Sequence, residues 1–398
     1  MISVSEAQEI LLKFSKNAPT ERVSFENCLN RMLAENIYAD RDAPPFDRVA
    51  MDGIAIQSDQ LQLRQQFEIE DIQAAGQEQK RLNNPENCLE VMTGAILPMH
   101  TDCVIPYEKL TINNGVAQLI STDHKAFQNT HKKGTDAKKG EQLLPSGTWI
   151  HPGVKGILAT IGHTAVKVMK VPKIMICSTG DELIPIQNTP LPHQIRRSNV
   201  YMLQAALKDL NIEAHTTHLP DDKDLLKASI GKLLEEYDLL MFSGAVSKGK
   251  YDFLPTVFKE LGIQIHIHGV RQKPGKPFLF GTKGSKSVFG FPGNPGSTLV
   301  CFHLYFKYWF NHYLGTSPQS NYAYLNKEVT FKKPLTNHLL IKCSFEDGKT
   351  LANPVANSGS GDLVHLAMAD GFLSLPAEKD TFKKGETFPI TYFHQTGM

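Results

Sequence analysis

The sequence predicts a multidomain α/β protein, with one doubly wound α/β domain, two small β-rich domains and an N-terminal helical or linker domain. Three observations predict this class. The chain has 398 residues, and a typical domain of roughly 150 residues then gives about 2.7 domains. Strand and helix patterns alternate after Lys173, as in sheets with crossover helices. Short β-rich pieces separated by Gly, Asn and Pro fill residues 67–144 and the segment after Pro318.

The N-terminal segment is predicted to be helical. Apolar residues recur at helical spacing between positions 7 and 14, after a predicted capping box of Ser5 and Gln8. A second helix is predicted over residues 24–35, which begin with a serine cap. A glycine-rich segment and a strand pattern at residues 165–171 are then predicted to return the chain to the domain that contains these helices. We therefore assign residues 1–45 and 141–172 to the N-terminal domain and residues 46–140 to an inserted β-rich domain.

Residues 173–318 are predicted to form the doubly wound domain. Strands are predicted at 173–178, 213–219, 238–243, 263–270, 273–281 and 287–293, and helices at 199–210, 225–237, up to 261, and at 294–313. Right-handed crossovers between such strands produce a parallel sheet. Residues 319–398 carry β patterns without long helical periodicity. They are predicted to form a barrel-like C-terminal domain.

Charge and composition exclude several classes of protein. Lys and Arg number 42 and Asp and Glu 41, a net charge of +1, whereas nucleic-acid binders usually show a basic surplus. No apolar run approaches the roughly 18 residues that cross a bilayer, and the N-terminus lacks the basic region of a signal peptide. The six cysteines form no C-x-x-C pair, which favours reduced thiols over a zinc ribbon or a disulfide scaffold. We expect a cytoplasmic protein that binds neither nucleic acid nor membrane.

Polar residues collect in the loops that follow the predicted strands of the doubly wound domain. The carboxyl ends of parallel strands meet along one edge of a sheet, where ligands bind. Two further loops, KPGKP (273–277) and FPGNPGS (291–297), carry glycines that let backbone approach a ligand. The loop residues are Ser178, Thr179, Gly180, Asp181, Glu182, Asp221, Asp222, Ser243, Gly244, Ser247, Gly249 and Asp252.

These residue types favour a phosphorylated ligand with a divalent cation. Backbone N–H groups and lysines bind anions, and carboxylates bind Mg²⁺. For any single aspartate, helix capping is an equally good explanation. Neither a Walker P-loop nor a dinucleotide fingerprint occurs, and no nucleophilic triad stands out. The histidine pairs His266 with His268 and His215 with His218 lack a third ligand at metal-binding spacing, so structural roles are predicted for them.

A second group of loops lies outside the doubly wound domain. Residues 44–53 place two aspartates between Pro and Gly, which is typical of a stiff hinge or of a site. Residues 91–95 and 132–136 are two further glycine-containing loops with hydroxyl or charged side chains. The residue patterns do not say whether these loops meet the edge of the sheet.

Six motifs occur in order along nearly the whole chain, namely PPFDRVAMDGIA, VMTGAILP, STGDEL, SGAVSKGKYDF, KPGKPF and GFPGNP. Together they resemble the molybdopterin molybdenumtransferase family, which includes MoeA and the E domain of gephyrin. The resemblance implies a four-part subunit that forms a homodimer, with a MogA-like α/β domain similar to molybdopterin adenylyltransferase. It also implies a reaction in which molybdate, as substrate, enters adenylylated molybdopterin and AMP is released with the help of Mg²⁺. The adenylyltransferase and proteins of molybdoenzyme maturation are the protein partners that it implies.

The resemblance also assigns site residues where the motifs match. The loops with Asp52, Thr93 and Asp136 would be contributed across the dimer cleft, and Lys273 and Lys276 would hold an oxyanion. The predicted catalytic residues are Asp52, Thr93, Asp136 and Glu182; the substrate-binding residues are Ser178, Thr179, Gly180, Asp221, Ser243, Gly244, Ser247, Lys273, Lys276, Pro292, Gly293, Asn294, Pro295 and Ser360; and the metal-binding residues are Glu182, Asp221 and Asp252.

The chain departs from the family pattern at four positions, and these leave two alternatives open. The family usually has serine at Val49, tyrosine at Ile54, glutamate at Thr135 and glycine at Ala245. A relative that lost the chemistry would be a molybdopterin-binding scaffold without catalysis. An enzyme similar to the adenylyltransferase is the other alternative, although the PPFD and KKGTD loops argue against it.

Overall fold

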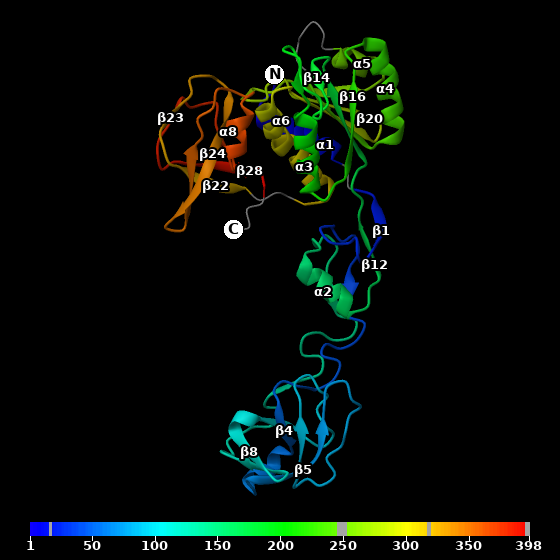
Figure 1. Cartoon of the computed structure of the whole chain (residues 1–398), viewed down its shortest axis with the longest axis vertical. Coiled ribbons are helices and arrows are strands. Elements are labelled where there is room, and N and C mark those ends of the chain that lie inside the picture. The colour runs from blue at the N-terminus through cyan, green and yellow to red at the C-terminus, as the bar shows by residue number, and fades with distance from the viewer. Residues whose placement is uncertain (16–17, 245–252, 317–319, 395–398) are drawn as a thin grey trace. The chain divides into compact units, whose positions relative to one another are not determined.

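The computed structural model describes residues 1–15, 18–244, 253–316 and 320–394. The chain divides into two compact units (Figure 1). One comprises Met1–Arg22, Asn30–Met32 and Val168–Met398, and the other comprises Val23–Leu29 and Leu33–Lys167. The four domains predicted from the sequence divide the chain more finely and stay a prediction. No helix within the described ranges has both the length and the apolar character needed to span a bilayer.

The larger unit contains a six-stranded sheet in the order β16-β13-β17-β21-β20-β18. Its strands are β13 (Ile174–Thr179), β16 (Ala214–Leu219), β17 (Leu239–Ser243), β18 (Gln264–His268), β20 (Leu279–Lys283) and β21 (Lys286–Phe291). The first four strands in this order are parallel, but β20 runs antiparallel to both of its neighbours. The prediction of a parallel sheet is therefore wrong at this edge. Two residues, with Gly284 at φ +58°, connect β20 to β21, and so short a loop permits only a hairpin.

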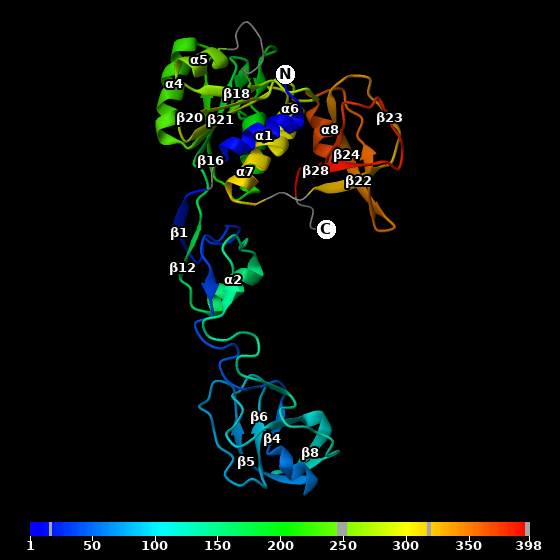
Figure 2. The ribbon, with the colours of Figure 1, turned by 180° about the vertical axis from the view of Figure 1, so that it is seen from behind.

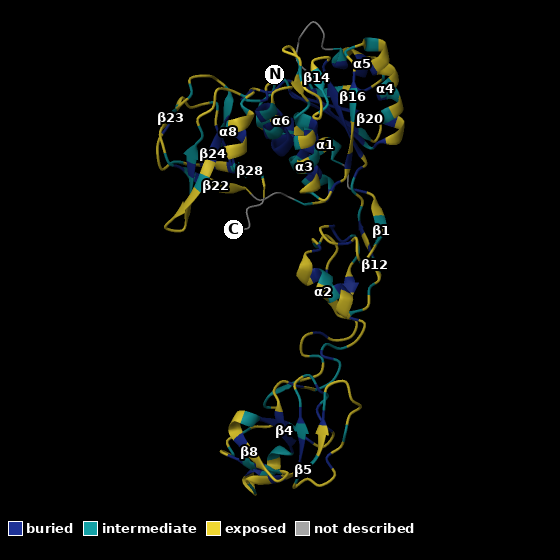
Figure 3. Ribbon diagram, in the orientation of Figure 1, coloured by how far each residue is buried: buried dark blue, intermediate teal, exposed yellow. Residues whose placement is uncertain are grey.

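Helices cover both faces of this sheet, as a doubly wound fold requires. Side chains alternate along β13, so that Ile174 and Ile176 pack into one core and Met175 and Cys177 into another. The central strands are buried along their whole length (Figure 3). The first core is covered by α1 (Val4–Phe14), α3 (Asn199–Lys208), α6 (Pro295–Cys301), the π-helical segment η3 (Phe302–Lys307) and α7 (Tyr308–Tyr313), and the second by α4 (Lys223–Glu236) and α5 (Leu254–Glu260).

Helix α1 lies beside α7 on the α/β core (Figure 2). Its buried residues Ala7 and Leu11 belong to the first core. The helix is confirmed, but its predicted cap is wrong by two residues. Ser3 is the N-cap, its Oγ accepting from the Glu6 N–H at 3.2 Å while Glu6 Oε2 accepts from the Ser3 N–H at 2.6 Å. Ser5 already lies inside the first turn.

The helix predicted over residues 24–35 does not form. Strand β1 (Thr20–Ser24) pairs with β12 (Ala165–Met169), and the following residues bond to distant segments. The N–H of Leu33 donates to the Thr148 carbonyl, and that of Ala34 donates to the Lys167 carbonyl, both at 2.9 Å. Pairing with segments more than a hundred residues away therefore overrides the local helical pattern.

The smaller unit contains the β-rich sheet, in the order β7-β4-β6-β5-β9-β8. Its larger core includes Ile54, Phe67 and Ile105 on one face, and a smaller cluster that includes Ala55 and Val104 lies on the other. The sheet strands are β4 (Gly53–Ile56), β5 (Gln66–Gln73), β6 (Cys88–Val91), β7 (Cys103–Pro106), β8 (Leu110–Asn113) and β9 (Val116–Leu119). The same unit also contains β2 (Ile37–Tyr38), β3 (Arg48–Val49), β10 (Thr130–His131), β11 (Gln142–Leu144), α2 (Pro152–Thr160) and the short η1 (Ser58–Gln62) and η2 (Tyr107–Lys109).

The C-terminal strands close into a barrel, as predicted. The pairing runs β24-β25-β22-β28-β26, and β26 pairs back with β24. Ile341 and Leu373 belong to the barrel core. Strand β19, from the KPGKP loop, extends the sheet beside β24. The elements are β19 (Gln272–Lys273), β22 (Asn321–Leu325), β23 (Val329–Thr330), β24 (Thr336–Glu346), β25 (Lys349–Pro354), α8 (Leu363–Met368), β26 (Gly371–Leu375), β27 (Thr381–Phe382) and β28 (Thr387–Tyr392).

Candidate functional site

A pocket of about 460 Å³ lies at the carboxyl edge of the parallel strands. It is formed where the loops after β13, β17 and β21 meet the start of α3. This is the place at which an open α/β sheet binds ligands. The predicted site residues that line it are Ser178, Thr179, Glu182, Ser243, Gly244, Gly293, Asn294 and Pro295.

Tight backbone packing shapes this pocket. Gly244 has φ +99°, and a Cβ there would lie 3.1 Å from the Thr179 carbonyl oxygen. The Asn199 amide at the start of α3 joins two of the loops, because its Nδ2 donates to Ser243 Oγ at 2.9 Å and to the Gly293 carbonyl at 2.6 Å. The backbone conformation at position 244 thus favours glycine, and Thr179 leaves little room for a side chain there.

Two arginines that the sequence analysis missed also line this pocket. Arg196 and Arg197 lie just before α3. Among the described residues, the buried Nε of Arg197 has no hydrogen-bond partner. An unpaired buried guanidinium N–H is ready to donate to an anion. The sequence did contain a signal for these residues, because two adjacent arginines stand directly before a helix that starts at the ligand-binding edge.

The carboxylates of this edge lie close together. Asp181 Oδ1 accepts from the Asp221 N–H at 3.3 Å. Burial of Asp221, together with the negative charges of Asp181 and Glu182, raises the pKa of Asp221. Asp222, by contrast, caps α4 by accepting from the N–H groups of Asp224 and Leu225, which is the structural role weighed above.

The predicted metal-binding residues are brought together only in part. Glu182 lines the pocket, whereas Asp221 does not. Asp252 and Ser247 lie outside the described residues, as does Ala245. Within the described ranges, no three His, Cys, Asp or Glu side chains form a group that could hold a metal ion.

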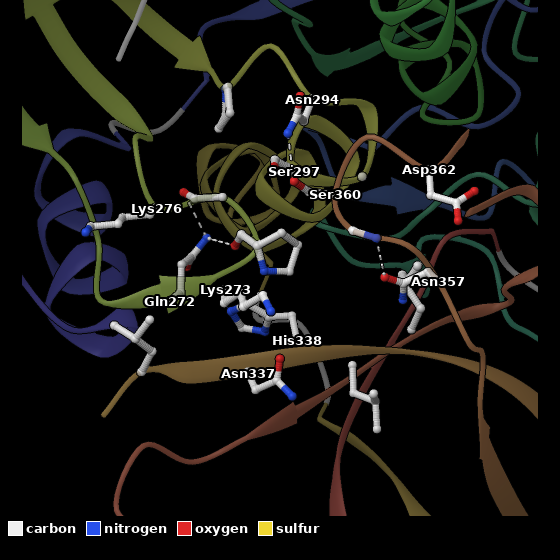
Figure 4. A pocket seen from close by; sticks show the side chains of 18 of the residues that line it. Gln272, Lys273, Lys276, Asn294, Ser297, Asn337, His338, Asn357, Ser360 and Asp362 are labelled. Carbon is white, nitrogen blue, oxygen red and sulfur yellow. Dashed lines mark hydrogen bonds between the residues drawn. The ribbon is translucent and has the colours of Figure 1, made fainter. Parts of the chain in front are cut away.

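A larger pocket, of about 850 Å³, lies between the KPGKP loop and the barrel (Figure 4). Gly293 and Asn294 line both pockets, so the loop after β21 separates them. Asn294 Nδ2 donates to Ser360 Oγ at 2.8 Å, which ties this loop to the barrel. The predicted site residues that line the larger pocket are Lys273, Lys276, Pro292, Gly293, Asn294 and Ser360.

The KPGKP loop is held by a buried side chain that sequence analysis missed. Gln272 is 1% exposed, and its Nε2 donates to the carbonyls of Pro274 and Gly275 at 3.1 and 3.3 Å. The hydroxyl of Tyr305 in η3 donates to Gln272 Oε1. Buried amide and hydroxyl groups paired in this way fix a single loop conformation. The loop therefore presents Lys273 and Lys276 from a rigid base.

His338 forms another part of the larger pocket's lining that was not predicted. It is 2% exposed, and its Nδ1 lies 3.1 Å from Ser374 Oγ. Burial lowers the pKa of His338 to about 3. The imidazole is therefore neutral at physiological pH, and the positive charges of this pocket are those of Lys273, Lys276 and Lys333.

The loops of the smaller unit bring Asp52 and Thr93 into direct contact. Asp52 Oδ1 accepts from Thr93 Oγ1 at 2.7 Å and from the Thr93 N–H at 2.6 Å. These two hydrogen bonds, the hydroxyl first, lower the pKa of Asp52. Asp52 is exposed, so this ionised carboxylate faces solvent at neutral pH.

Backbone hydrogen bonds join the three predicted loops of this unit. Val49 donates to the Ala95 carbonyl and Ala50 to the Asn129 carbonyl, each at 2.9 Å. The Gly134 N–H donates to the Pro44 carbonyl at 3.0 Å, and the Lys133 N–H donates to Asp47 Oδ1 at 2.8 Å. The segments 44–53, 91–95 and 132–136 thus form one cluster, which we call the Asp52 loop cluster.

Two departures from the family pattern lie in the core and not in an exposed loop. Val49 and Ile54 are fully buried. Thr135 turns its hydroxyl back onto the Lys132 carbonyl at 2.5 Å. Where the family usually has a charged glutamate, this chain therefore has a hydroxyl that stabilises the turn through its hydrogen bond to Lys132.

Two of the histidines predicted to be structural make side-chain hydrogen bonds within the fold. His266 is structural, as predicted, with Nε2 2.8 Å from Thr282 Oγ1 and its ring stacked on Phe14. His218 places Nδ1 2.9 Å from Ser178 Oγ. His218 therefore supports a residue that lines the smaller pocket.

Comparison with protein families covers nearly the whole chain. The model described as MoeA N-terminal region (domain I and II) matches residues 2–162. The model of a probable molybdopterin binding domain matches residues 175–312, and that of the MoeA C-terminal region (domain IV) matches residues 322–393. These three regions, in this order, define a protein of the MoeA type with a molybdopterin-binding domain at its centre.

Individual relatives belong to the same class of protein. A molybdopterin molybdenumtransferase of Synechocystis is 41% identical over 98% of this chain and 99% of its own length, and one of Bacillus subtilis is 32% identical over 98% and 93%. The crystal structure of a molybdopterin biosynthesis MoeA protein from Pyrococcus horikoshii superposes with a TM-score of 0.81 at 30% identity, covering 99% of each chain. The chain therefore belongs to the MoeA family of molybdopterin molybdenumtransferases, in molybdenum cofactor biosynthesis.

Proposed function

We propose that the chain inserts molybdate into adenylylated molybdopterin and releases AMP. The observation that carries this proposal is the pair of cation-lined pockets on either side of the loop after β21. Arg196 and Arg197 line one pocket, and Lys273 and Lys276 line the other. This arrangement fits a ligand that carries a pyrophosphate next to the group that takes up molybdate.

The two pockets would bind different groups, the pyrophosphate in one and molybdate in the other. Arginines bind phosphates in bidentate fashion, so the smaller pocket would take the pyrophosphate, with Ser178, Thr179 and Ser243 as further donors. Compact ammonium groups suit a small oxyanion, so Lys273 and Lys276 would hold molybdate. The ligand carries its own sulfurs, and the protein supplies position and charge.

The carboxylates at the sheet edge fit a magnesium ion. Burial and the negative charges of Asp181 and Glu182 raise the pKa of Asp221, and a cation would relieve the repulsion among these carboxylates. Mg²⁺ usually takes one or two protein carboxylates and completes its shell with substrate phosphates, so a ready group of three side chains is not needed. Glu182 and Asp221 would hold the ion, which would neutralise charge on the phosphates.

The Asp52 loop cluster would complete the site from a second subunit of a homodimer. Its carboxylates Asp52 and Asp136 are exposed, and Thr93 keeps Asp52 ionised. An ionised carboxylate can orient a water molecule toward the pyrophosphate. A protein that sediments as a monomer under assay conditions would overturn this arrangement.

The proposed substrate also implies where the chain acts. Adenylylated molybdopterin would come from a molybdopterin adenylyltransferase, and the product would pass to proteins of molybdoenzyme maturation. All six cysteines are free, and five of them are buried. Free thiols support a reducing compartment such as the cytoplasm.

The test is AMP release from adenylylated molybdopterin under anaerobic conditions, with Mg²⁺, and with or without micromolar molybdate. We expect AMP release that depends on molybdate. Binding of the ligand without release would instead identify a molybdopterin-binding scaffold. Consumption of ATP with transfer of AMP to molybdopterin would identify an adenylyltransferase.

A further inference from the structure

Asp136 has a partner in the Asp52 loop cluster that its motif does not include. Strand β10 pairs antiparallel with β3, so that His131 lies directly opposite Arg48. His131 Nε2 is 2.9 Å from Asp136 Oδ1, and His131 Nδ1 is 3.0 Å from Arg48 Nη2. The imidazole thus bridges a guanidinium and a carboxylate.

The bridge fixes the position of the imidazole proton. A guanidinium can only donate hydrogen bonds, so His131 Nδ1 must accept from Arg48. The remaining proton is then on Nε2, which donates to Asp136 Oδ1. A doubly protonated ring would present an N–H to Arg48 and lose that contact.

The neighbouring lysines have other partners. Lys132 Nζ lies 3.5 Å from the centre of the Phe127 ring, and Lys133 Nζ lies 3.6 Å from Asp42 Oδ2. The Asp136 backbone is held by the Ala43 carbonyl. In the part of the chain that the structure describes, the recorded side-chain hydrogen bond to Asp136 comes from His131.

We propose that His131 is a positioning residue: held in its Nε2–H form by Arg48, it orients the Asp136 carboxylate without adding charge to it. This proposal rests on the function proposed above for Asp136. A neutral N–H donor restricts the orientations open to the Asp136 carboxylate. The effect should therefore appear in turnover more than in binding.

Two variants separate orientation from a merely structural role. His131→Gln keeps one acceptor and one donor at similar spacing, whereas His131→Leu keeps neither. We expect His131→Leu to lower kcat for AMP release about fivefold, the scale of an exposed polar contact, with KM changed less than twofold. His131→Gln should retain at least half of the turnover. Half-buried His163, which lies outside the Asp52 loop cluster, provides the control, His163→Leu, with unchanged kcat.

A double-mutant comparison tests whether His131 acts through Asp136. In an Asp136→Asn background, His131→Leu should cause no further loss of kcat. The proposal is overturned if the two losses multiply, if His131→Gln falls as far as His131→Leu, or if His131→Leu turns over like the wild type.

Nitrogen-15 NMR of the imidazole gives a readout that does not depend on activity. We expect the Nε2–H tautomer in the wild type and a mixture of tautomers in Arg48→Met. An Nδ1–H tautomer in the wild type would overturn the proposal. If the wild type released no AMP, the proposed function would fail, and the NMR result would still decide the geometry of His131.

Discussion

At the scale of single residues, the contact between Thr93 and Asp52 links two motifs that are 41 positions apart. Both hydrogen bonds to Asp52 Oδ1 come from Thr93. Thr93→Val removes the hydroxyl donor and keeps the backbone N–H, so we expect the pKa of Asp52 to rise toward its ordinary value. We also expect turnover to fall about five- to tenfold, the scale of one hydrogen bond with a net contribution of about 1 kcal/mol.

Carbon-13 NMR titration of the Asp52 carboxyl checks the pKa shift in Thr93→Val. Thr93→Ser restores a hydroxyl and serves as the matched control. An Asp52 pKa in the valine variant equal to that of the wild type would show that the hydroxyl does not stabilise the carboxylate. A rise in pKa without a fall in turnover would remove the ionisation of Asp52 from the mechanism.

Site residues were predictable where they belong to a contiguous motif and not where the fold creates them. Asp52 and Thr93 were assigned from such motifs, and the structure brings them into contact. Gln272 and His131 were missed because their function depends on Tyr305 in one case and on Arg48 in the other. Neither contact leaves a local pattern in the sequence.

At the scale of elements, the cap of α1 is a clear test of the structure. Ser3→Ala removes the hydroxyl that accepts from the Glu6 N–H, which should lower the free energy of unfolding by ~1 kcal/mol. Ser5→Ala is the matched control. Within the described part of the chain, the Ser5 hydroxyl makes its side-chain hydrogen bond to the Ser3 hydroxyl and to no backbone group of the helix. Urea unfolding of the whole chain measures both variants. Equal losses would show that the cap is not at Ser3.

The elements that were predicted correctly are those whose pattern is local. Alternation of strands and helices placed β13, α3 and β16 within a few residues of their bounds. Residues 24–35 failed because Leu33 and Ala34 bond to partners that no local pattern reveals. The sheet was predicted parallel because its edge hairpin, from β20 to β21, was interpreted as separate strands.

At the scale of the whole molecule, two buried histidines should make stability depend on pH. Burial lowers the pKa of His303 and of His338 from 6.5 to about 3. Between these two values the unfolded chain binds a proton at each ring and the folded chain does not. The unfolded state therefore gains stability as pH falls. From pH 8 to pH 5, we expect the free energy of unfolding to drop by ~2 kcal/mol for each histidine.

This pH window is distinct from that of the carboxylates. The pKa values of Asp362 and Asp370 are lowered in the fold, so the stability that they contribute is lost only as pH falls below the ordinary value of 3.8. Urea unfolding between pH 8 and pH 5 thus reports on the histidines. Replacing both His303 and His338 by Gln should flatten the profile in this range, whatever it does to stability at pH 8. A profile equally steep in the double variant would show that other groups take up the protons, and that the barrel and the α/β core do not depend on keeping these two rings neutral.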